Sequence, residues 1–199
     1  MANEYATVEM LKLALAIQAD DATQDAQLQQ ALAAAARGID RDTGRRFWLD
    51  PAPVQRVYNP RGRTVCDESG ERILVDDVGS TTGLVVETGP AGGPWTAVTD
   101  YETAPDNALV DGRPITALLR SYGSWGQGGN RVRVTARFGW PGIPDEVIEA
   151  TKIQANRLFK RKDSPEGVAS AGEWGVVRVS RVDPDVYALI KHFVLPGFG

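Results

Sequence analysis

The sequence is poor in the residues that build most metal sites and covalent catalytic centres. Its 199 residues include one cysteine, Cys66, and one histidine, His192. A single cysteine cannot form an intrachain disulfide, and one cysteine with one histidine cannot complete a zinc cage. We therefore expect no metal, no cofactor and a reducing environment for this chain.

Long apolar runs and an excess of basic residues are also missing. The apolar run at residues 11–17 is interrupted by Lys12 and is far shorter than the ~18 residues that span a bilayer. Glu4 precedes this run, which argues against a secretory signal. The 22 basic and 26 acidic side chains give a net charge of −4, which excludes a general nucleic-acid coat because such a protein needs a Lys/Arg excess. We expect no membrane partner.

Known catalytic motifs are absent as well. The sequence has no G-x-S-x-G, no H-E-x-x-H and no phosphate-binding G-x-x-x-x-G-K-[ST]. The glycine cluster at residues 126–129 is not a dinucleotide fingerprint, because Arg131 stands where the last glycine belongs and no helical pattern follows. The adjacent carboxylates Asp76 and Asp77 would point to opposite faces of a strand. We expect no enzyme.

The N-terminal 46 residues predict two helices. Thr7 is placed to cap a short helix that ends at Leu15. Thr23 is placed to cap a longer helix over residues 24–42, and Gly44 is placed to end it. The apolar stripe of the longer helix is Leu28, Leu32, Ala35 and Ile39.

Three arginines form a ridge on the longer helix, opposite its apolar stripe. Arg37, Arg41 and Arg45 are spaced four residues apart. The ridge is either a solvated face or a surface for a partner or DNA. In both cases we expect it to stay accessible, and replacing all three by Gln to change folding by no more than ~1 kcal/mol.

Residues 47–140 show short β-type runs separated by turn residues. In the last run, apolar residues alternate with arginines, so one face of that strand should be buried and the other charged. We expect a turn at Gly79 between two of the strands. The predicted strands are 55–58, 72–75, 84–87, 95–98, 115–120 and 131–138.

Helical patterns return after residue 140. Pro144 suits the first position of an amphipathic helix of about 18 residues, which the basic residues Lys160, Arg161 and Lys162 close. A loop at 163–175 and a short strand or extended segment at 176–179 follow.

Asp183 and Pro184 then start a short helix whose apolar face is Val186, Leu189, Ile190 and Phe193. The end of the chain, residues 194–199, is too apolar for a solvated tail. Either its own chain or another subunit must cover it.

These patterns together predict an α+β protein. We expect a small helical bundle from residues 1–46 and 141–199, the latter including a C-terminal docking tail. An inserted antiparallel β domain, barrel or sandwich-like, should occupy residues 47–140.

Several strings at both ends of the chain resemble the head-to-tail adaptor proteins of long-tailed bacteriophages, in particular phages of actinobacteria. About 100 residues carry the resemblance, which is specific only in combination. The strings are YATVEMLK at 5–12, LQQALAAAARGID at 28–40, TGRRF at 43–47, FGWPGIPDEVIEAT at 138–151, QANRLFKRKDSPEGV at 154–168 and RVDPD at 181–185.

The resemblance implies a non-enzymatic virion protein, made in the host cytoplasm and located in the neck of the particle. Family members form a ring, commonly of twelve copies, beneath the portal protein. The ring bridges the portal to a tail-side stopper or terminator protein, and double-stranded DNA passes through its lumen, without sequence readout, during packaging and ejection. The β domain departs from the smallest, largely helical connectors, so its role is not carried over.

The resemblance also assigns candidate sites. We expect the chain from Phe193 to Gly199 to be extended, held by the portal and poorly ordered in the isolated subunit. The expected portal-docking residues are Phe193, Val194, Leu195, Pro196 and Phe198. The expected ring or channel contacts are Arg37, Arg41, Arg45, Lys160, Arg161 and Lys162.

Two other functions stay open at this point. A DNA-binding packaging accessory could use the arginine ridge with residues 160–162, and salt-sensitive binding to duplex DNA would favour it. A hydrolase with a β-barrel domain is the third alternative.

Overall fold

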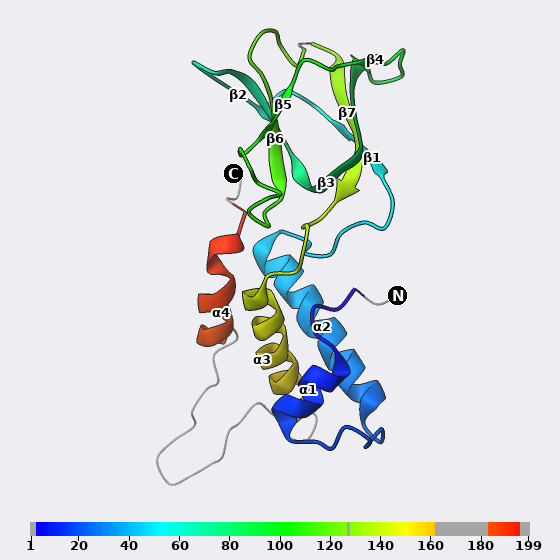
Figure 1. Cartoon of the computed structure of the whole chain (residues 1–199), viewed down its shortest axis with the longest axis vertical. Coiled ribbons are helices and arrows are strands. Elements are labelled where there is room, and N and C mark those ends of the chain that lie inside the picture. The colour runs from blue at the N-terminus through cyan, green and yellow to red at the C-terminus, as the bar shows by residue number, and fades with distance from the viewer. Residues whose placement is uncertain (1–2, 127, 162–182, 196–199) are drawn as a thin grey trace. The chain divides into compact units, whose positions relative to one another are not determined.

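A computed structural model describes residues 3–126, 128–161 and 183–195 of the chain. It divides into two compact units, one of residues 1–45 with 143–199 and one of residues 46–142. The first unit is helical and the second is a β-sheet, so the predicted α+β class is confirmed (Figure 1).

The helical unit is organised around two long helices that pack against each other, α2 (Asp25–Thr43) and α3 (Asp145–Arg161). Two short helices, α1 (Val8–Leu15) and α4 (Pro184–Ile190), contact α3, and the 3-10 turn η1 (Lys191–Phe193) follows α4. The shared core contains Leu11, Leu28, Leu32, Ala35 and Ala155, all fully buried. The predicted stripe of α2 is therefore the face that packs.

Local sequence signals set most of the helix ends. The Thr7 side chain accepts from the Met10 amide at 3.3 Å and starts α1. Asp183 accepts from the amides of Asp185 and Val186, with Pro184 at the first position of α4. Gly44 ends α2 in the left-handed conformation, at φ 68°.

The predicted Thr23 cap of α2 is wrong. The amide and the hydroxyl of Thr23 both donate to the Asp21 carboxylate, at 3.0 Å and 2.6 Å. This local turn competes with capping, because a side chain bonded to its own neighbourhood cannot reach the helix amides. The helix instead starts at Asp25, and Gln24 makes no side-chain capping bond.

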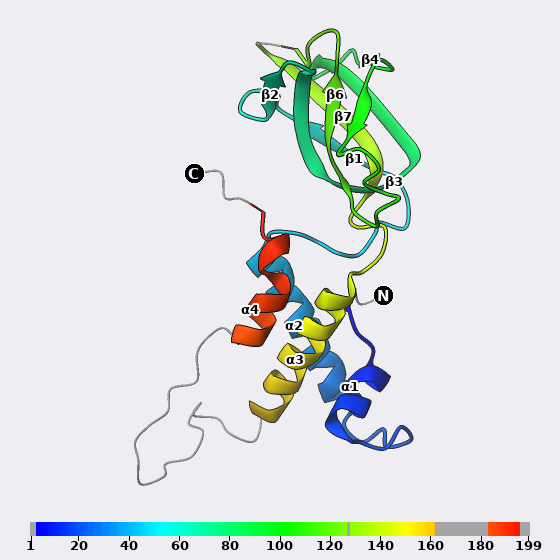
Figure 2. The ribbon, with the colours of Figure 1, turned by 60° about the vertical axis from the view of Figure 1, so that its left-hand side comes forward.

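The β unit is one open antiparallel sheet in which β1, β7, β3, β6 and β5 follow in that order, with β2 and β4 also paired to β3. Among the described residues its two end strands, β1 and β5, do not pair with each other, so the sheet is open rather than a closed barrel. Figure 2 shows how strongly it curls. The strands are β1 (Val54–Tyr58), β2 (Thr64–Asp67), β3 (Gly70–Pro90), β4 (Thr96–Ala97), β5 (Glu102–Ala104), β6 (Ile115–Arg120) and β7 (Asn130–Phe138).

Strand β3 corrects the prediction of two strands separated by a turn at Gly79. It is one strand of 21 residues that pairs with β6 in its first half and with β7 in its second half. The register shifts between Val78 and Val85, where the strand bends and changes partner. A Cβ on Gly79 would lie 2.8 Å from the Gly139 carbonyl oxygen, so this glycine permits close backbone approach rather than ending the strand.

The core of the β unit follows the alternation predicted for the last strand. On β7, Val132, Val134, Ala136 and Phe138 are buried, and the arginines between them are partly exposed. Trp125 is also fully buried, and its indole nitrogen donates to the Glu71 carbonyl oxygen at 2.9 Å. The short strands β2 and β5 were not predicted.

The segments that enter and leave the β unit lie side by side. The rings of Phe47 and Trp140 have centroids 5.2 Å apart. The Asp50 amide donates to the Phe138 carbonyl oxygen at 2.8 Å. Gly139 adopts φ 114°, and a Cβ there would lie 2.0 Å from the Trp48 carbonyl oxygen. Only glycine fits this crossing.

Candidate functional site

The arginine ridge on α2 has three different environments rather than one. Arg37 donates to the Asn3 carbonyl oxygen at 2.7 Å and lies 3.2 Å from the Asp40 carboxylate. Arg41 is 77% exposed and lies 3.4 Å from Asp42. Acidic neighbours therefore offset the charges of the first two arginines.

Arg45 differs because it holds the C-terminal segment. Its Nε donates to the Phe193 carbonyl oxygen at 2.7 Å. The Leu195 amide donates to the Thr43 carbonyl oxygen at 2.9 Å. Thr43 at the end of α2 and Arg45 just beyond it thus bind the backbone of the residues before and after Val194.

The expectation of an extended segment that begins at about Phe193 is wrong at its first residue. Phe193 belongs to η1, and its side chain is 9% exposed, on the same apolar face as Val186 and Ile190. Val194 and Leu195 are each 42% exposed and remain available for a docking contact. The other two predicted docking residues, Pro196 and Phe198, lie outside the described residues.

The predicted cations do not form one site. Arg45 follows the C-terminal end of α2, which lies beside the start of α3, whereas Lys160 and Arg161 are in the last turn of α3, at the other end of that helix (Figure 1). The side chains of Lys160 and Arg161 are exposed. Lys162 lies outside the described residues, as do the predicted loop at 163–175 and the segment at 176–179.

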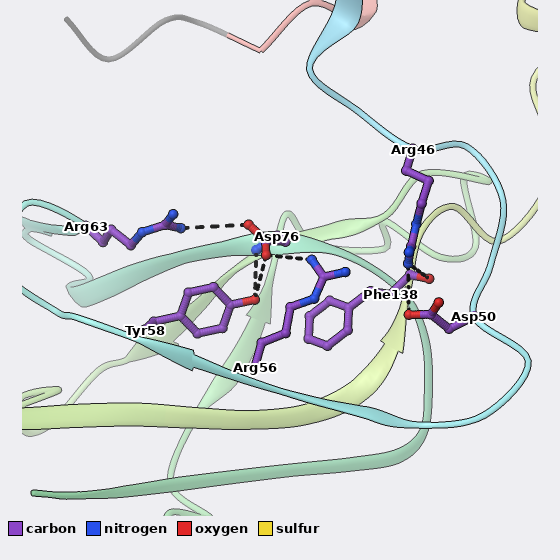
Figure 3. Close-up of polar contacts among 7 residues, drawn as sticks. All are labelled: Arg46, Asp50, Arg56, Tyr58, Arg63, Asp76 and Phe138. Carbon is purple, nitrogen blue, oxygen red and sulfur yellow. Dashed lines mark hydrogen bonds and ion pairs between the residues drawn. The ribbon is translucent and has the colours of Figure 1, made fainter. Parts of the chain in front are cut away.

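A polar cluster in the β unit was not predicted (Figure 3). The Asp76 carboxylate accepts from Arg56 at 2.6 Å and from the Tyr58 hydroxyl at 3.1 Å, and Arg63 approaches to 3.9 Å. Arg56 also stacks 4.0 Å above the Phe138 ring. Burial, with the neighbouring Asp76 charge, raises the pKa of Tyr58 above its usual range. Tyr58 therefore stays protonated and serves as a donor.

Asp77, the neighbour of Asp76, has a separate role. Its carboxylate accepts from the Trp140 indole nitrogen at 3.1 Å, and its carbonyl oxygen accepts from the Gly139 amide at 2.8 Å. The two adjacent aspartates thus bond different partners and do not form an acid/base pair. Arg56 and Tyr58 lie on β1 and Asp76 lies on β3, and both strands pair with β7, so the tertiary fold brings these side chains together without any signal in their sequence spacing.

A second cluster fixes the entry to the β unit, also drawn in Figure 3. Arg46 lies 2.8 Å from the Asp50 carboxylate and donates to the Phe138 carbonyl oxygen at 3.2 Å. The same guanidinium stacks 3.8 Å above the Trp48 ring. These contacts order the segment between α2 and β1.

The described residues contain no cluster of three or more His, Cys, Asp or Glu side chains that could hold a metal ion. Cys66 is exposed on β2 in the β unit, and His192 is exposed in the helical unit, with its ring 4.0 Å from that of Phe193. No helix within the described ranges has the length and apolar content to cross a membrane. The described residues carry instead a set of partly exposed ion pairs and several exposed apolar side chains.

The fold is that of an α+β chain in which a β-sheet unit is inserted between helices. No protein family and no curated protein matches the sequence. Among solved structures, the chain is similar to one from the "Neck of empty GTA particle computed with C6 symmetry", with a TM-score of 0.54 and 19% identity. It is also similar to one from the "Virion of native gene transfer agent (GTA) particle", with a TM-score of 0.55 and 19% identity. Both likenesses cover 96% of this chain and 91% of the other, so the shared fold includes both units.

Proposed function

We propose that this chain is a structural neck protein of a phage-like particle, with no enzymatic activity. The observation that carries the proposal is the fold, which matches over 96% of the chain and 91% of a chain from a gene transfer agent neck. The string resemblances at both ends of the sequence support the same role independently.

In this role the protein is a head-to-tail adaptor that forms a ring of copies, with twelve as the expected number. The ring joins the portal protein to a tail-side stopper or terminator, and double-stranded DNA passes through its centre. A ring suits this chain because a modest contact between neighbours is repeated around a closed symmetry. Portal docking is assigned to the exposed residues next to η1, Val194 and Leu195, with Pro196 and Phe198 beyond them.

The charge distribution supports passage of DNA rather than tight binding to it. The net charge is −4, and Asp40 and Asp42 neutralise the nearest ridge arginines. A lumen with few unpaired cations holds the phosphate backbone weakly. The same pairing counts against a DNA-binding packaging accessory, which would need the ridge charges for phosphate contacts.

The experiment is to purify particles that contain this protein, count its copies with isotope-labelled reference peptides, and locate a tagged copy by electron microscopy. We expect about a dozen copies, all at the junction of head and tail. One copy per particle, copies in the hundreds, or a tag distributed over the capsid would contradict the proposal.

A further inference from the structure

Helix α1 is apolar on two sides, and only one of them packs against other residues within the described part of the chain. Leu11 on the inner side is fully buried in the helical core. On the outer side, Leu13 is 84% exposed, Met10 is 44% exposed and Ala14 is also exposed. These three residues follow the i, i+3, i+4 spacing of one helix face. We name them the α1 patch.

Helix α4 carries a second exposed apolar surface. Val186 and Ile190 face the helical unit and are buried, whereas Tyr187 is 56% exposed and Ala188 is exposed. Tyrosine is among the residues that contribute most at protein interfaces, because a rigid ring covers a large area at low entropic cost. We name Tyr187 and Ala188 the α4 patch.

The two patches are carried by helices that lie on either side of α3. Helix α3 contacts both α1 and α4 and lies between them in both views (Figures 1 and 2). Two different patches of one subunit can meet when copies associate head to tail, which is the arrangement that closes a ring. A two-fold dimer would instead pair one patch with itself.

Glu9 places a negative charge beside the α1 patch, and the α4 patch has the positive charge of Lys191 on one side and the negative charge of Asp185 on the other. Glu9 is exposed next to Met10, and the Thr7 hydroxyl holds the pKa of its carboxyl below the usual range, so the group is ionised at neutral pH. Lys191 and His192 are exposed one turn beyond Tyr187, and Asp185 is the one exposed carboxylate among the described residues of α4. Complementary charge of this kind fixes the orientation of a contact.

We propose that the α1 patch of one copy binds the α4 patch of the next copy, with Leu13 against Tyr187 and Glu9 toward Lys191. This contact rests on the proposed ring, and it is the surface through which neighbouring copies would associate. A second copy of this chain is the partner of both patches.

Cross-linking tests the direction of the contact. In a Cys66→Ser background, one protein carries Leu13→Cys and another carries Tyr187→Cys. We expect the mixture to form a disulfide-linked dimer under mild oxidation, whereas neither protein alone does so to a comparable extent. A Leu13→Cys protein that cross-links to itself would show a two-fold contact, and a mixture that yields no dimer would show that the patches do not meet. Either result overturns the proposal.

Substitution tests the apolar contact in the full chain. Leu13→Glu should reduce association, measured by light scattering or native mass spectrometry over a range of concentrations, by at least about tenfold, because a large side chain no longer becomes buried. Val110→Glu is the matched control, since Val110 is 87% exposed in the β unit, and it should leave association unchanged. Equal association of both variants overturns the proposal. So does a lower melting temperature of a monomeric Leu13→Glu protein, which would show that its own chain covers the patch.

A charge exchange tests the pairing of Glu9 with Lys191. Glu9→Lys and Lys191→Glu should each weaken association, and the double variant should restore much of it. A double variant as weak as the single ones would overturn this pairing. The contact and the neck role can fail separately. If the two proteins cross-link but the protein is not found at the neck, the contact stands and the neck role is wrong. If the protein is found at the neck but the two proteins do not cross-link, the neck role stands and the contact is wrong.

Discussion

The Arg45 guanidinium donates to the carbonyl oxygen of Phe193, a residue 148 positions further along the chain, at 2.7 Å. This bond joins the residue that follows the Gly44 cap of the second helix to the 3-10 turn near the C-terminus. Arg37 also donates to a distant backbone carbonyl, that of Asn3, whereas Arg41 contacts the carboxylate of Asp42 next to it. A substitution at Arg45 should therefore affect structure, whereas one at Arg41 should affect only the surface.

We expect Arg45→Gln to lower the free energy of unfolding of the helical unit by about 1–2 kcal/mol, since a bond from a charged donor is lost. Hydrogen exchange of residues 183–195 should become faster in the same variant. Arg41→Gln should change stability by less than about 0.5 kcal/mol, because its ion pair is exposed. Equal effects of the two substitutions would mean that the bond to Phe193 adds nothing. The expectation from sequence is a change of no more than ~1 kcal/mol for all three arginines together, and the bond to Phe193 raises the cost expected for Arg45.

Asp76→Ala should destabilise the β unit by about 1–3 kcal/mol, because it leaves both Arg56 and the Tyr58 hydroxyl without their acceptor. Urea unfolding followed by tryptophan fluorescence measures the change. Glu68→Ala, at an exposed position between β2 and β3, is the control and should be neutral. A neutral Asp76→Ala would show that water replaces the carboxylate.

The Glu87 and Arg133 pair predicts a loss of stability in acid. The two residues are directly opposite on β3 and β7, and the guanidinium donates to both carboxylate oxygens, at 2.6 Å and 2.7 Å. Hydrogen bonding from Arg133 lowers the pKa of Glu87 below its unfolded value of 4.5. The stability that the pair contributes is therefore present above the unfolded pKa and is lost as pH falls through the folded one.

Unfolding of the wild type and of Glu87→Gln should be compared near neutral pH and well below the unfolded pKa of Glu87. The wild type should be the more stable at neutral pH, and the difference should shrink in acid. A difference that stays constant with pH would show that packing, and not ionisation, accounts for it.

Gly139→Ala should disrupt the crossing between the two segments that flank the sheet. Its Cβ would lie 2.0 Å from the Trp48 carbonyl oxygen, at a φ of 114° that alanine rarely adopts. We expect a loss of more than about 2 kcal/mol or failure to fold, measured by soluble yield and thermal unfolding. Gly142→Ala has open space around its Cβ and should be nearly neutral. A stable Gly139→Ala protein would require the Trp48 segment to move.

Two truncations separate docking from folding at the C-terminus. Removal of 196–199 keeps Leu195 and its bond to Thr43, so we expect a folded helical unit with weaker portal binding in a pull-down assay. Removal of 194–199 also deletes that bond and should bind the portal more weakly still, with a small loss of stability. Unchanged portal binding by both truncated chains would rule out docking through this segment.

Local chemistry explains which parts of the fold could be predicted. The cap at Thr7, the Asp183 and Pro184 start of α4 and the glycine end of α2 each depend on groups within a few residues. The buried face of β7 could be predicted for the same reason, because the alternation of apolar and polar residues lies within one short strand. Such signals are complete within one short window of sequence.

The errors come from competition and from distance. Thr23 has the right type for a cap, but Asp21 binds it first. Gly79 is typical of a turn, but here it lets β3 bend beneath a neighbouring backbone. The Arg45 bond to Phe193 and the Arg56 bond to Asp76 join residues that only the tertiary fold brings together, so no local pattern could indicate them.

The contact between the rings of Phe47 and Trp140 also bears on how such a chain can evolve. Because the entry and exit of the sheet are adjacent, residues 46–142 form a cassette that begins and ends at nearly the same place. A recombination event that exchanges residues 46–142 interrupts no described α-helix, because α2 ends before this range and α3 begins after it. If the range is removed, a short linker can join α2 to α3. The helical unit can thus be inherited unchanged while a lineage gains, loses or swaps the β module, as an inserted gene segment would be traded between genomes.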